Sequence, residues 1–300
     1  MQTISEIKRL LEQAGLRPNR RLGQCFLIDK NLLGKVVDLA ELAGDETVLE
    51  VGAGTGTLTE ELLHRAARVV AVEVDRRLAA LLRRRLGERE GFVLIDRDVL
   101  AGKHALATEV TSALGASAHL VANLPYSIAT PLVAQCLIDS WRASNGRRAD
   151  LCRFDRLTFS VQREVADRLA AAPGGRTYGP VSVIVRLLGR LTAGAALPAS
   201  AFWPRPKVSG RVVRIDFVPA AAARVGSIDT LRAIVRMAFG QRRKQIRAIV
   251  KQADAPFGRQ AMLEGLAAAG IDPTWRAENV SPEQFCTMAN FLDGPTGHSR

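Results

Sequence analysis

With 300 residues, 47% of them hydrophobic, the chain has ample material for a globular core and is longer than most single domains. Its 42 Lys and Arg residues outnumber 30 Asp and Glu residues, and this net charge of +12 favours a polyanionic partner over an unpartnered basic surface. The 4 cysteines form no C-x-x-C pair and no apolar run approaches roughly 18 residues, which argues against a zinc site, a disulfide framework and a membrane span. We therefore expect a soluble, cytoplasmic protein.

Helical and strand patterns alternate along the first half of the chain. The N-terminus, MQTISEIKRLLEQAGL, has the periodicity of an amphipathic helix and not of a signal peptide. Strand-like apolar runs follow at residues 47–54, 68–75, 91–98, 118–125 and 156–162. Helical patterns lie between them at residues 58–67, 76–86 and 129–141. This alternation predicts an α/β fold, with a parallel sheet covered by helices on both faces.

The following residues add an edge to this sheet and then change character. Two strand-like stretches, residues 179–197 and 209–219, have no clear helix between them, which predicts an antiparallel pair at one edge. An alanine-rich linker then leads into helix-like segments at residues 228–252, 257–270 and 281–294. We predict two domains, an α/β domain over residues 1–222 and a small all-helical domain over residues 223–300.

A glycine-rich turn, VLEVGAGTGTLTEELL, follows the first predicted strand and precedes a helix. Gly52, Gly54 and Gly56 allow a tight turn and a close approach of the backbone to a ligand. A dinucleotide fingerprint has the spacing G-x-G-x-x-G, whereas Glu50 here leads E-x-G-x-G-x-G, which favours S-adenosylmethionine over NAD. The alternative is a strand-to-helix turn that needs glycine only for its conformation.

Acidic residues end the next two predicted strands. Glu73 lies 17 residues beyond Gly56, near the usual place of a carboxylate that receives ribose hydroxyls. Asp98 ends the third strand and is predicted to bind the adenine amine of the cofactor. Ligands lie across the carboxyl ends of the strands in such sheets, so both carboxylates are expected in one crevice. Asp75 and Asp96 compete with them for these roles.

The segment VANLPYSIATPLV places an amide, a proline and an aromatic ring at the end of the fourth predicted strand. The exocyclic amine of adenine is a poor nucleophile, because its lone pair is delocalised into the ring. Acceptors that hold its hydrogens turn the lone pair toward a methyl donor, and the Asn123 side chain and the Leu124 carbonyl, constrained by Pro125, can supply them. Tyr126 offers a flat face for a flipped base. An N-cap Asn, a turn Pro and a packed Tyr are the alternative interpretation.

Together these motifs resemble the ribosomal RNA adenine dimethyltransferases, which place two methyl groups on N6 of adenine. The matching segments follow the family's order over nearly the whole chain: RRLGQCFLIDKNLL, VLEVGAGTGTLT, AVEVD, NLPYSIATPLV, VQREVADRLAA, AFWPRPKVSGRVVRI and GIDPTWRAENVSPEQF. The resemblance implies a Rossmann-like class I methyltransferase sheet and S-adenosylmethionine as cofactor, without a metal. The implied target is two adjacent adenines in a hairpin near the 3′ end of small-subunit (16S) rRNA, with a role in ribosome biogenesis.

The resemblance also assigns roles to single residues. It places Gln24, Cys25 and Leu27 along the methionine part of the cofactor. It completes the cofactor pocket with Gly52, Gly54, Glu73, Asp98 and Asn123. Phe202 would stack on the target adenine opposite Tyr126. Cys25 replaces the Asn of the family's LGQNFL motif, and a thiol is a weaker hydrogen-bonding group than an amide.

Basic residues beside these motifs are predicted to bind RNA phosphates, and the helical domain over residues 223–300 is predicted to be an RNA-binding domain that follows the catalytic domain over residues 1–222. These basic residues are Arg20, Arg21, Arg205, Lys207, Arg242, Arg243, Lys244 and Arg247. The segment RMAFGQRRKQIRAIVK contains no acidic residue, although a solvated basic helix is the alternative. The implied partner is small-subunit rRNA or an immature 30S particle, recognised by a monomer through RNA backbone and shape.

Two other functions fit parts of the sequence. A related group of enzymes methylates large-subunit rRNA and gives macrolide resistance, but the closing motif GIDPTWRAENVSPEQF favours the small-subunit group. The second is an RNA-binding assembly or transcription factor that has kept the fold and lost turnover, and Cys25 is its main support. The glycine spacing disfavours an NAD-dependent oxidoreductase.

Overall fold

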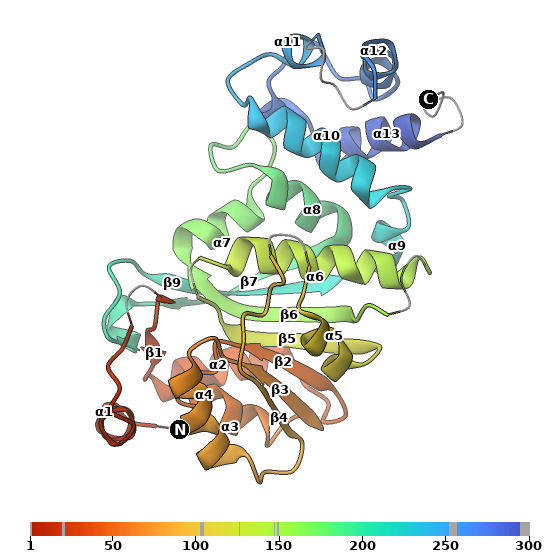
Figure 1. Ribbon diagram of the computed structural model, residues 1–300. Helices are drawn as coiled ribbons and strands as arrows, with labels where there is room; N and C mark the ends of the chain where they lie inside the picture. Colours follow the sequence, from red (N-terminus) through yellow and green to blue (C-terminus); the bar gives the residue numbers. More distant parts are fainter. Residues whose placement is uncertain are drawn as a thin grey trace. The chain divides into compact units, whose positions relative to one another are not determined.

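The computed structural model describes residues 2–19, 22–102, 105–125, 127–146, 148, 150–251 and 257–294 (Figure 1). The chain forms two compact units, the first with residues 1–166 and 191–216, and the second with residues 167–190 and 217–300. Residues 167–190 thus belong with the C-terminal helices, whereas the predicted domains divide the chain once, at residue 222. That division into a catalytic and an RNA-binding domain stays a prediction.

The first unit is built on a seven-stranded sheet (Figure 1). Its strands are β2 (Thr47–Val51), β3 (Arg68–Val72), β4 (Phe92–Ile95), β5 (Ser117–Asn123), β6 (Arg153–Gln162), β7 (Gly189–Leu197) and β9 (Gly210–Phe217), in the spatial order β4-β3-β2-β5-β6-β9-β7. Strands β2 to β6 are parallel and β9 is antiparallel to β6. The chain order reverses between β2 and β5, and sheets of this kind bind ligands at that switch point.

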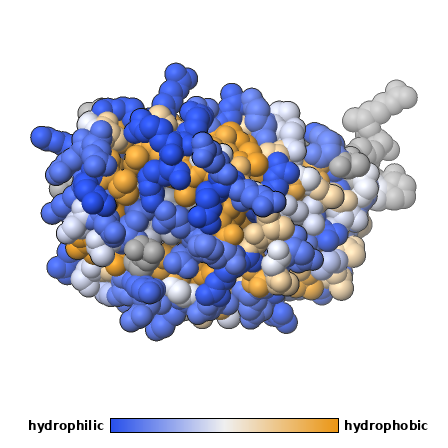
Figure 2. Space-filling model, turned by 90° about the horizontal axis from the view of Figure 1, so that it is seen from below, coloured by the Kyte–Doolittle hydropathy of each residue, from blue (hydrophilic) through white to orange (hydrophobic). Residues whose placement is uncertain are grey.

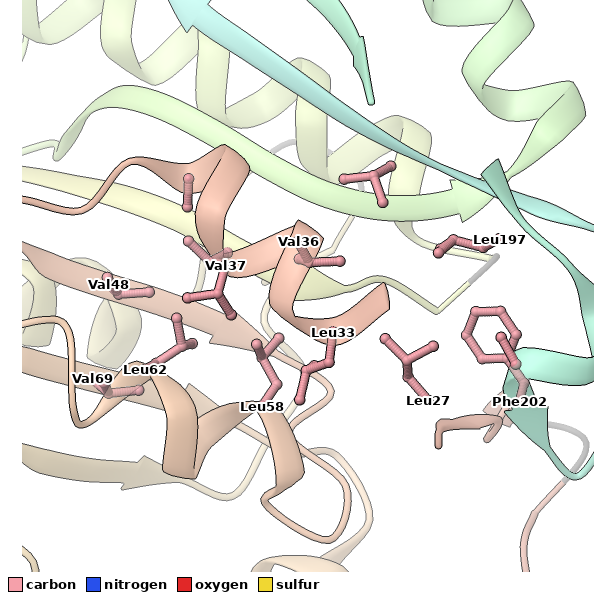
Figure 3. Packing of buried hydrophobic residues seen from close by; sticks show 14 residues of the cluster. Leu27, Leu33, Val36, Val37, Val48, Leu58, Leu62, Val69, Leu197 and Phe202 are labelled. Carbon is pink, nitrogen blue, oxygen red and sulfur yellow. The ribbon is translucent and has the colours of Figure 1, made fainter. Parts of the chain in front are cut away.

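Helices cover both faces of the sheet. They are α2 (Lys30–Ala40), α3 (Thr57–Leu62), α4 (Arg76–Leu86), α5 (Thr108–Leu114) and α6 (Ala129–Ser144), and α7 (Arg163–Ala170) follows β6. On one face, side chains of α2 and α3 pack on Val48 and Val69 (Figure 3). The alternate residues Leu49 and Val70 point to the other face and are equally unexposed. The predicted α/β fold, a largely parallel sheet covered by helices on both faces, is thereby confirmed.

An N-terminal helix and a two-stranded sheet complete the first unit. Helix α1 (Ile4–Gln13) begins with a capping box and packs on α4. Strand β1 (Phe26–Leu27) pairs antiparallel with β8 (Phe202–Trp203), directly after the 3-10 helix η2 (Ala199–Ala201). Phe26 stacks on Trp203, with ring centroids 6.3 Å apart. This pairing joins the LGQ-motif segment to the segment that contains Phe202.

The second unit is helical. It contains α8 (Pro180–Leu188), α9 (Pro219–Ala222), α10 (Ile228–Gly240), α11 (Ile246–Val250), α12 (Arg259–Ala268), the 3-10 helix η3 (Ala277–Asn279) and α13 (Pro282–Asp293). Helix α13 packs on α8, α10 and α12. Tyr178 is fully buried against Phe239, and its hydroxyl donates to the Val280 carbonyl at 3.1 Å. The all-helical C-terminal region is confirmed.

Two predicted elements were wrong. Residues 180–188 were expected to be a strand and form α8. Pro180 occupies the first helical position, and residues 181–188 are all buried except Arg186, so the run shows no alternation of faces. The helix expected over residues 228–252 is broken after Gly240. Arg242, Arg243 and Lys244 lie in the turn between α10 and α11, and at the start of α11 the Ile246 N–H donates to the Trp275 carbonyl at 2.7 Å.

The face of the molecule shown in Figure 2 is largely hydrophilic, with hydrophobic side chains exposed between the polar ones. A mixed surface of this kind is usual, since polar side chains cannot cover a whole protein. Among the described residues, the large hydrophobic side chains with the greatest exposure are Ile4, Val74 and Val208. None of the described helices is long and apolar enough to cross a bilayer.

Candidate active site

A cavity of about 220 Å³ lies in the first unit at the carboxyl ends of β2, β3 and β5. Its lining includes every residue predicted to bind the cofactor, namely Gln24, Cys25, Leu27, Gly52, Gly54, Glu73, Asp98 and Asn123. Leu124, Pro125 and Phe202, from the predicted catalytic set, line the same cavity. Tyr126, the remaining member of that set, lies outside the described residues. The fold therefore brings together segments that are far apart in the sequence.

The glycines of the turn have two different structural roles. Gly52 and Gly54 have positive φ angles of 77° and 60° and line the cavity. A Cβ on Gly52 would lie 3.3 Å from Pro125, and one on Gly54 would lie 3.0 Å from Phe26. A Cβ on Gly56 would instead lie 2.9 Å from Leu82 of α4, so Gly56 serves helix packing and not the cavity.

Glu73 is bound to the glycine turn through its carboxylate. One oxygen accepts the Gly54 N–H and the other accepts the Asp75 N–H, both at 2.9 Å. Burial raises the pKa of this carboxyl, because the Glu73 residue is only 4% exposed. Each carboxylate oxygen keeps a further lone pair, so the side chain can still accept hydrogen bonds from a ligand.

The competing carboxylates at the strand ends are used in other ways. Asp75 caps α4 by accepting the Arg77 N–H at 3.0 Å. Asp96 pairs with Arg83 at 3.3 Å. Asp98 is exposed, lines the cavity and accepts the Leu100 N–H through one oxygen at 2.9 Å, which leaves its other oxygen available. The geometry therefore favours Asp98 over Asp96 as a ligand-binding carboxylate.

Glu50 is a cavity residue to which sequence reasoning gave no role. Burial, and then the nearby charge of Glu73, raise the pKa of its carboxyl to about 8. Its Oε2 atom and the hydroxyls of Thr55 and Thr57 are buried and have no hydrogen-bond partner among the described residues. All three residues line the cavity. The signal in the sequence was the carboxylate that leads E-x-G-x-G-x-G.

These atoms fit S-adenosylmethionine. A buried carboxylate with an unsatisfied oxygen needs a proton or a cation, and this cofactor carries an ammonium group. Unsatisfied hydroxyls suit its carboxylate as hydrogen-bond donors. Val74, 49% exposed and also on the cavity wall, offers an apolar surface to a flat purine ring.

Asn123 ends β5 with its amide held at both ends. Its Nδ2 donates to the Cys25 backbone carbonyl at 3.0 Å, and its Oδ1 accepts the hydroxyl of Ser160. Ser160 also lines the cavity, and no motif pointed to it. Cys25 therefore contributes its backbone to this site, independently of the thiol that replaces the family's Asn.

Gln24 and Phe202 are each held by the surrounding structure. The Gln24 side chain accepts the Asn19 N–H at 2.8 Å and donates to Asp75 at 3.1 Å, which fastens the N-terminal loop to α4. Phe202 is 6% exposed and packs with Leu27 (Figure 3). It is thus a core residue with a surface on the cavity.

The predicted RNA-binding residues are distributed over both units. Arg205 and Lys207 are exposed in the loop after β8, and Arg20 and Arg21 lie outside the described residues. Arg243, Lys244 and Arg247 are exposed in and beside the turn after α10. Arg242 is engaged within the protein, because its guanidinium donates to Glu278 at 2.8 Å and to the Arg176 carbonyl at 2.7 Å.

Comparison with known proteins gives a consistent result. Residues 15–294 match the family model described as Ribosomal RNA adenine dimethylase. A curated relative from Phenylobacterium zucineum, named Ribosomal RNA small subunit methyltransferase A, is 36% identical over 290 residues, which cover 97% of this chain and 93% of the relative. A relative of the same name from Magnetococcus marinus is 37% identical over 290 residues, 97% of each chain.

Solved structures share the fold. A dimethyladenosine transferase from Plasmodium falciparum aligns with a TM-score of 0.68 at 22% identity, over 89% of this chain and 97% of the other. The 23S rRNA methyltransferase ErmE aligns with a TM-score of 0.58 at 24% identity, over 90% of this chain and 100% of the other. At these identities the likeness concerns the fold alone.

Proposed function

This chain belongs to the ribosomal RNA adenine dimethylase family, and from this premise we propose that it dimethylates N6 of two adjacent adenines near the 3′ end of 16S rRNA. The family predicted from the motifs is confirmed, and with it the class of the protein, an rRNA methyltransferase. One structural observation supports a mechanism for this reaction. The glycine turn, Asn123 and Phe202 line a single cavity at the switch point of the sheet.

The proposed cofactor is S-adenosylmethionine, which when bound supplies an electrophilic methyl group. Glu50 would receive its ammonium group, since Oε2 of this buried carboxylate has no partner among the described residues. Glu73 would accept the ribose hydroxyls, and Asp98 the adenine amine. Val74 would lie against the adenine ring. The assignment orders the cofactor along the carboxyl ends of β2, β3 and β4.

The proposed role of Asn123 is to align the target amine. Its Oδ1 and the Leu124 carbonyl would accept the two hydrogens of N6 and turn the lone pair toward the methyl donor. The rings of Tyr126 and Phe202 would hold the flipped base between them. The methylated amine becomes acidic enough to release its proton to solvent, so no general base is required. Alignment of this kind contributes about 7–11 kcal/mol to a rate.

The proposed substrate is small-subunit rRNA, free or in an immature 30S particle, bound by a monomer in the cytoplasm. Exposed Arg205 and Lys207 in one unit and Arg243, Lys244 and Arg247 in the other would contact phosphates. The names of the curated relatives favour the small subunit over the large one as the substrate. The likeness to ErmE concerns the fold and does not alter this preference.

Methylation of purified ribosomal subunits tests the proposal. Undermethylated small subunits and large subunits are incubated separately with labelled S-adenosylmethionine and the protein, and their nucleosides are analysed. We expect N6-dimethyladenosine from small subunits and none from large subunits. If only large subunits became labelled, the proposed function would be wrong and the protein would be a large-subunit rRNA methylase. RNA binding without label in either subunit would indicate an assembly factor.

A further inference from the structure

Ser160 lies directly opposite Asn123 on the neighbouring strand. The parallel register of β5 and β6 pairs the two residues, and the Leu124 N–H donates to the Ser160 carbonyl at 3.2 Å. Only 2% of Ser160 is exposed, and the residue lines the cavity. Its hydroxyl donates to Asn123 Oδ1. A buried hydroxyl is thus joined to the amide that the proposed function uses.

The orientation of the Asn123 amide follows from its second partner. Its Nδ2 donates to the Cys25 backbone carbonyl, and a carbonyl can only accept a hydrogen bond. The amino group must therefore face Cys25, and the oxygen must face Ser160. Neither flipping the amide nor rotating it keeps both hydrogen bonds.

We propose that Ser160 is a positioning residue for methyl transfer, an inference that rests on the proposed function and deepens it. The hydroxyl occupies one lone pair of Asn123 Oδ1 and leaves the other for the amine of the target adenine. Rotation of the amide is restricted before the substrate binds, so the acceptor is preorganised. The backbone of Cys25 holds the other end, whichever side chain stands at that position.

Three variants test this role. Ser160→Ala removes the hydroxyl, and Ser160→Thr retains it. Thr158→Val is the matched control, because Thr158 lies on the same face of β6, is unexposed, and its hydroxyl has no hydrogen-bond partner among the described residues. Each variant is compared with the wild type by thermal unfolding, and rates are expressed per folded protein.

Kinetics on undermethylated small subunits give the first readout. We expect kcat of Ser160→Ala to fall about 3- to 10-fold, the net worth of one hydrogen bond, with the KM for S-adenosylmethionine unchanged. Ser160→Thr should restore most of the rate, and Thr158→Val should keep the wild-type rate. An unchanged kcat in Ser160→Ala, or a loss of equal size in Thr158→Val, would overturn the positioning role.

The side-chain amide signals of Asn123 in a ¹⁵N–¹H NMR spectrum give a readout that needs no turnover. They are assigned by their loss in Asn123→Ala. We expect them to shift in Ser160→Ala and to stay near the wild-type position in Ser160→Thr and Thr158→Val. Unshifted signals in Ser160→Ala would overturn the inference whatever the activity. The signals could also shift in Ser160→Ala while the wild-type protein transfers no methyl group. That result would support the hydrogen bond from Ser160 to Asn123 and contradict the proposed function instead.

Discussion

Gly52 and Pro125 pack against each other across the corner of the cavity. A Cβ on Gly52 would lie 3.3 Å from both Cγ and Cδ of Pro125, and φ of Gly52 is 77°. The glycine turn after β2 and the segment after β5 are thus in close contact, at a spacing tighter than most Cβ contacts and at a φ that favours glycine. The turn proposed for the cofactor and the segment proposed for the target base therefore form one packed corner.

Gly52→Ala should damage both stability and methyl transfer. We expect a loss of about 1–3 kcal/mol in the free energy of unfolding, because alanine is strained at this φ and its methyl group presses on Pro125. Displacement of Pro125 should lower kcat well beyond the loss of folded protein. Urea unfolding and methylation rates per folded protein measure the two effects.

Gly102→Ala is the control for backbone strain alone. Gly102 has a φ of 84°, but a Cβ there would meet none of the described residues within 4 Å. We expect a smaller loss of stability, about 1 kcal/mol, and an unchanged kcat. If both variants lowered kcat equally, the contact between Gly52 and Pro125 would have no bearing on the reaction.

Asn123→Ala should abolish most of the dimethyladenosine. Removal of a preorganised hydrogen-bonding group from a reacting centre costs on the order of 100-fold or more in kcat. Asn145→Ala is a matched control, because the Asn145 amide donates to the Trp141 carbonyl at 2.8 Å, at the end of α6 and away from the cavity lining. Nucleoside analysis of small subunits measures the product. Equal product from Asn123→Ala and wild type would remove Asn123 from the mechanism.

Glu50 should make the stability of the cofactor-free protein fall as pH rises. Burial raises the pKa of its carboxyl from 4.5 to about 8, so between these values the folded protein holds a proton that the unfolded chain has released. Within this range, Glu50 therefore lowers the free energy of unfolding by about 1.4 kcal/mol for each unit by which the pH rises. Glu50→Gln lacks this dependence, and its stability relative to wild type should increase from pH 5 to pH 8.

Urea unfolding of wild type and Glu50→Gln at pH 5, 6.5 and 8 measures this difference in stability. Groups that titrate equally in the two proteins contribute equally to both and drop out of the difference. Saturating S-adenosylmethionine should flatten the wild-type slope, since its ammonium group would favour the charged carboxylate. Parallel stability curves for wild type and Glu50→Gln would contradict the raised pKa.

Arg242 and Arg243 are neighbours with different expected roles. Arg242→Ala should cost the second unit about 1–2 kcal/mol, because it removes donors to Glu278 and to the Arg176 carbonyl. Exposed Arg243→Ala should change stability by less than about 0.5 kcal/mol. It should weaken RNA binding and reduce the slope of log K against log salt by about 0.9 if it neutralises one phosphate.

Unfolding curves and salt titrations with 16S rRNA separate these two outcomes. If Arg242→Ala kept the wild-type stability but bound RNA more weakly, Arg242 would contact RNA in the complex in place of Glu278 and the Arg176 carbonyl. An unchanged salt slope in Arg243→Ala would remove this residue from the RNA-binding set.

Several predicted elements followed from local pattern and are present in the structure. The five apolar runs contain β2, β3 and β4 and overlap β5 and β6, which begin one and three residues earlier than predicted. The glycine turn lies between β2 and α3, as expected, because alternating buried strands and amphipathic helices have distinct periods. Residues 180–188 were mistaken for a strand, because a helix buried on nearly all sides lacks the polar face that reveals its period. Their burial comes from helices that follow much later in the chain.

The sequence by itself determined the family, the order of the strands along the chain and the residues that end them. These features depend on residue types at short spacings, which a single chain displays directly. Tertiary structure alone decided that Ser160 faces Asn123, that Oε2 of the buried Glu50 has no hydrogen-bond partner among the described residues, and that Arg242 is engaged by Glu278. Strand register, desolvation and ion pairing join residues distant in sequence, and no local pattern records which of them will meet.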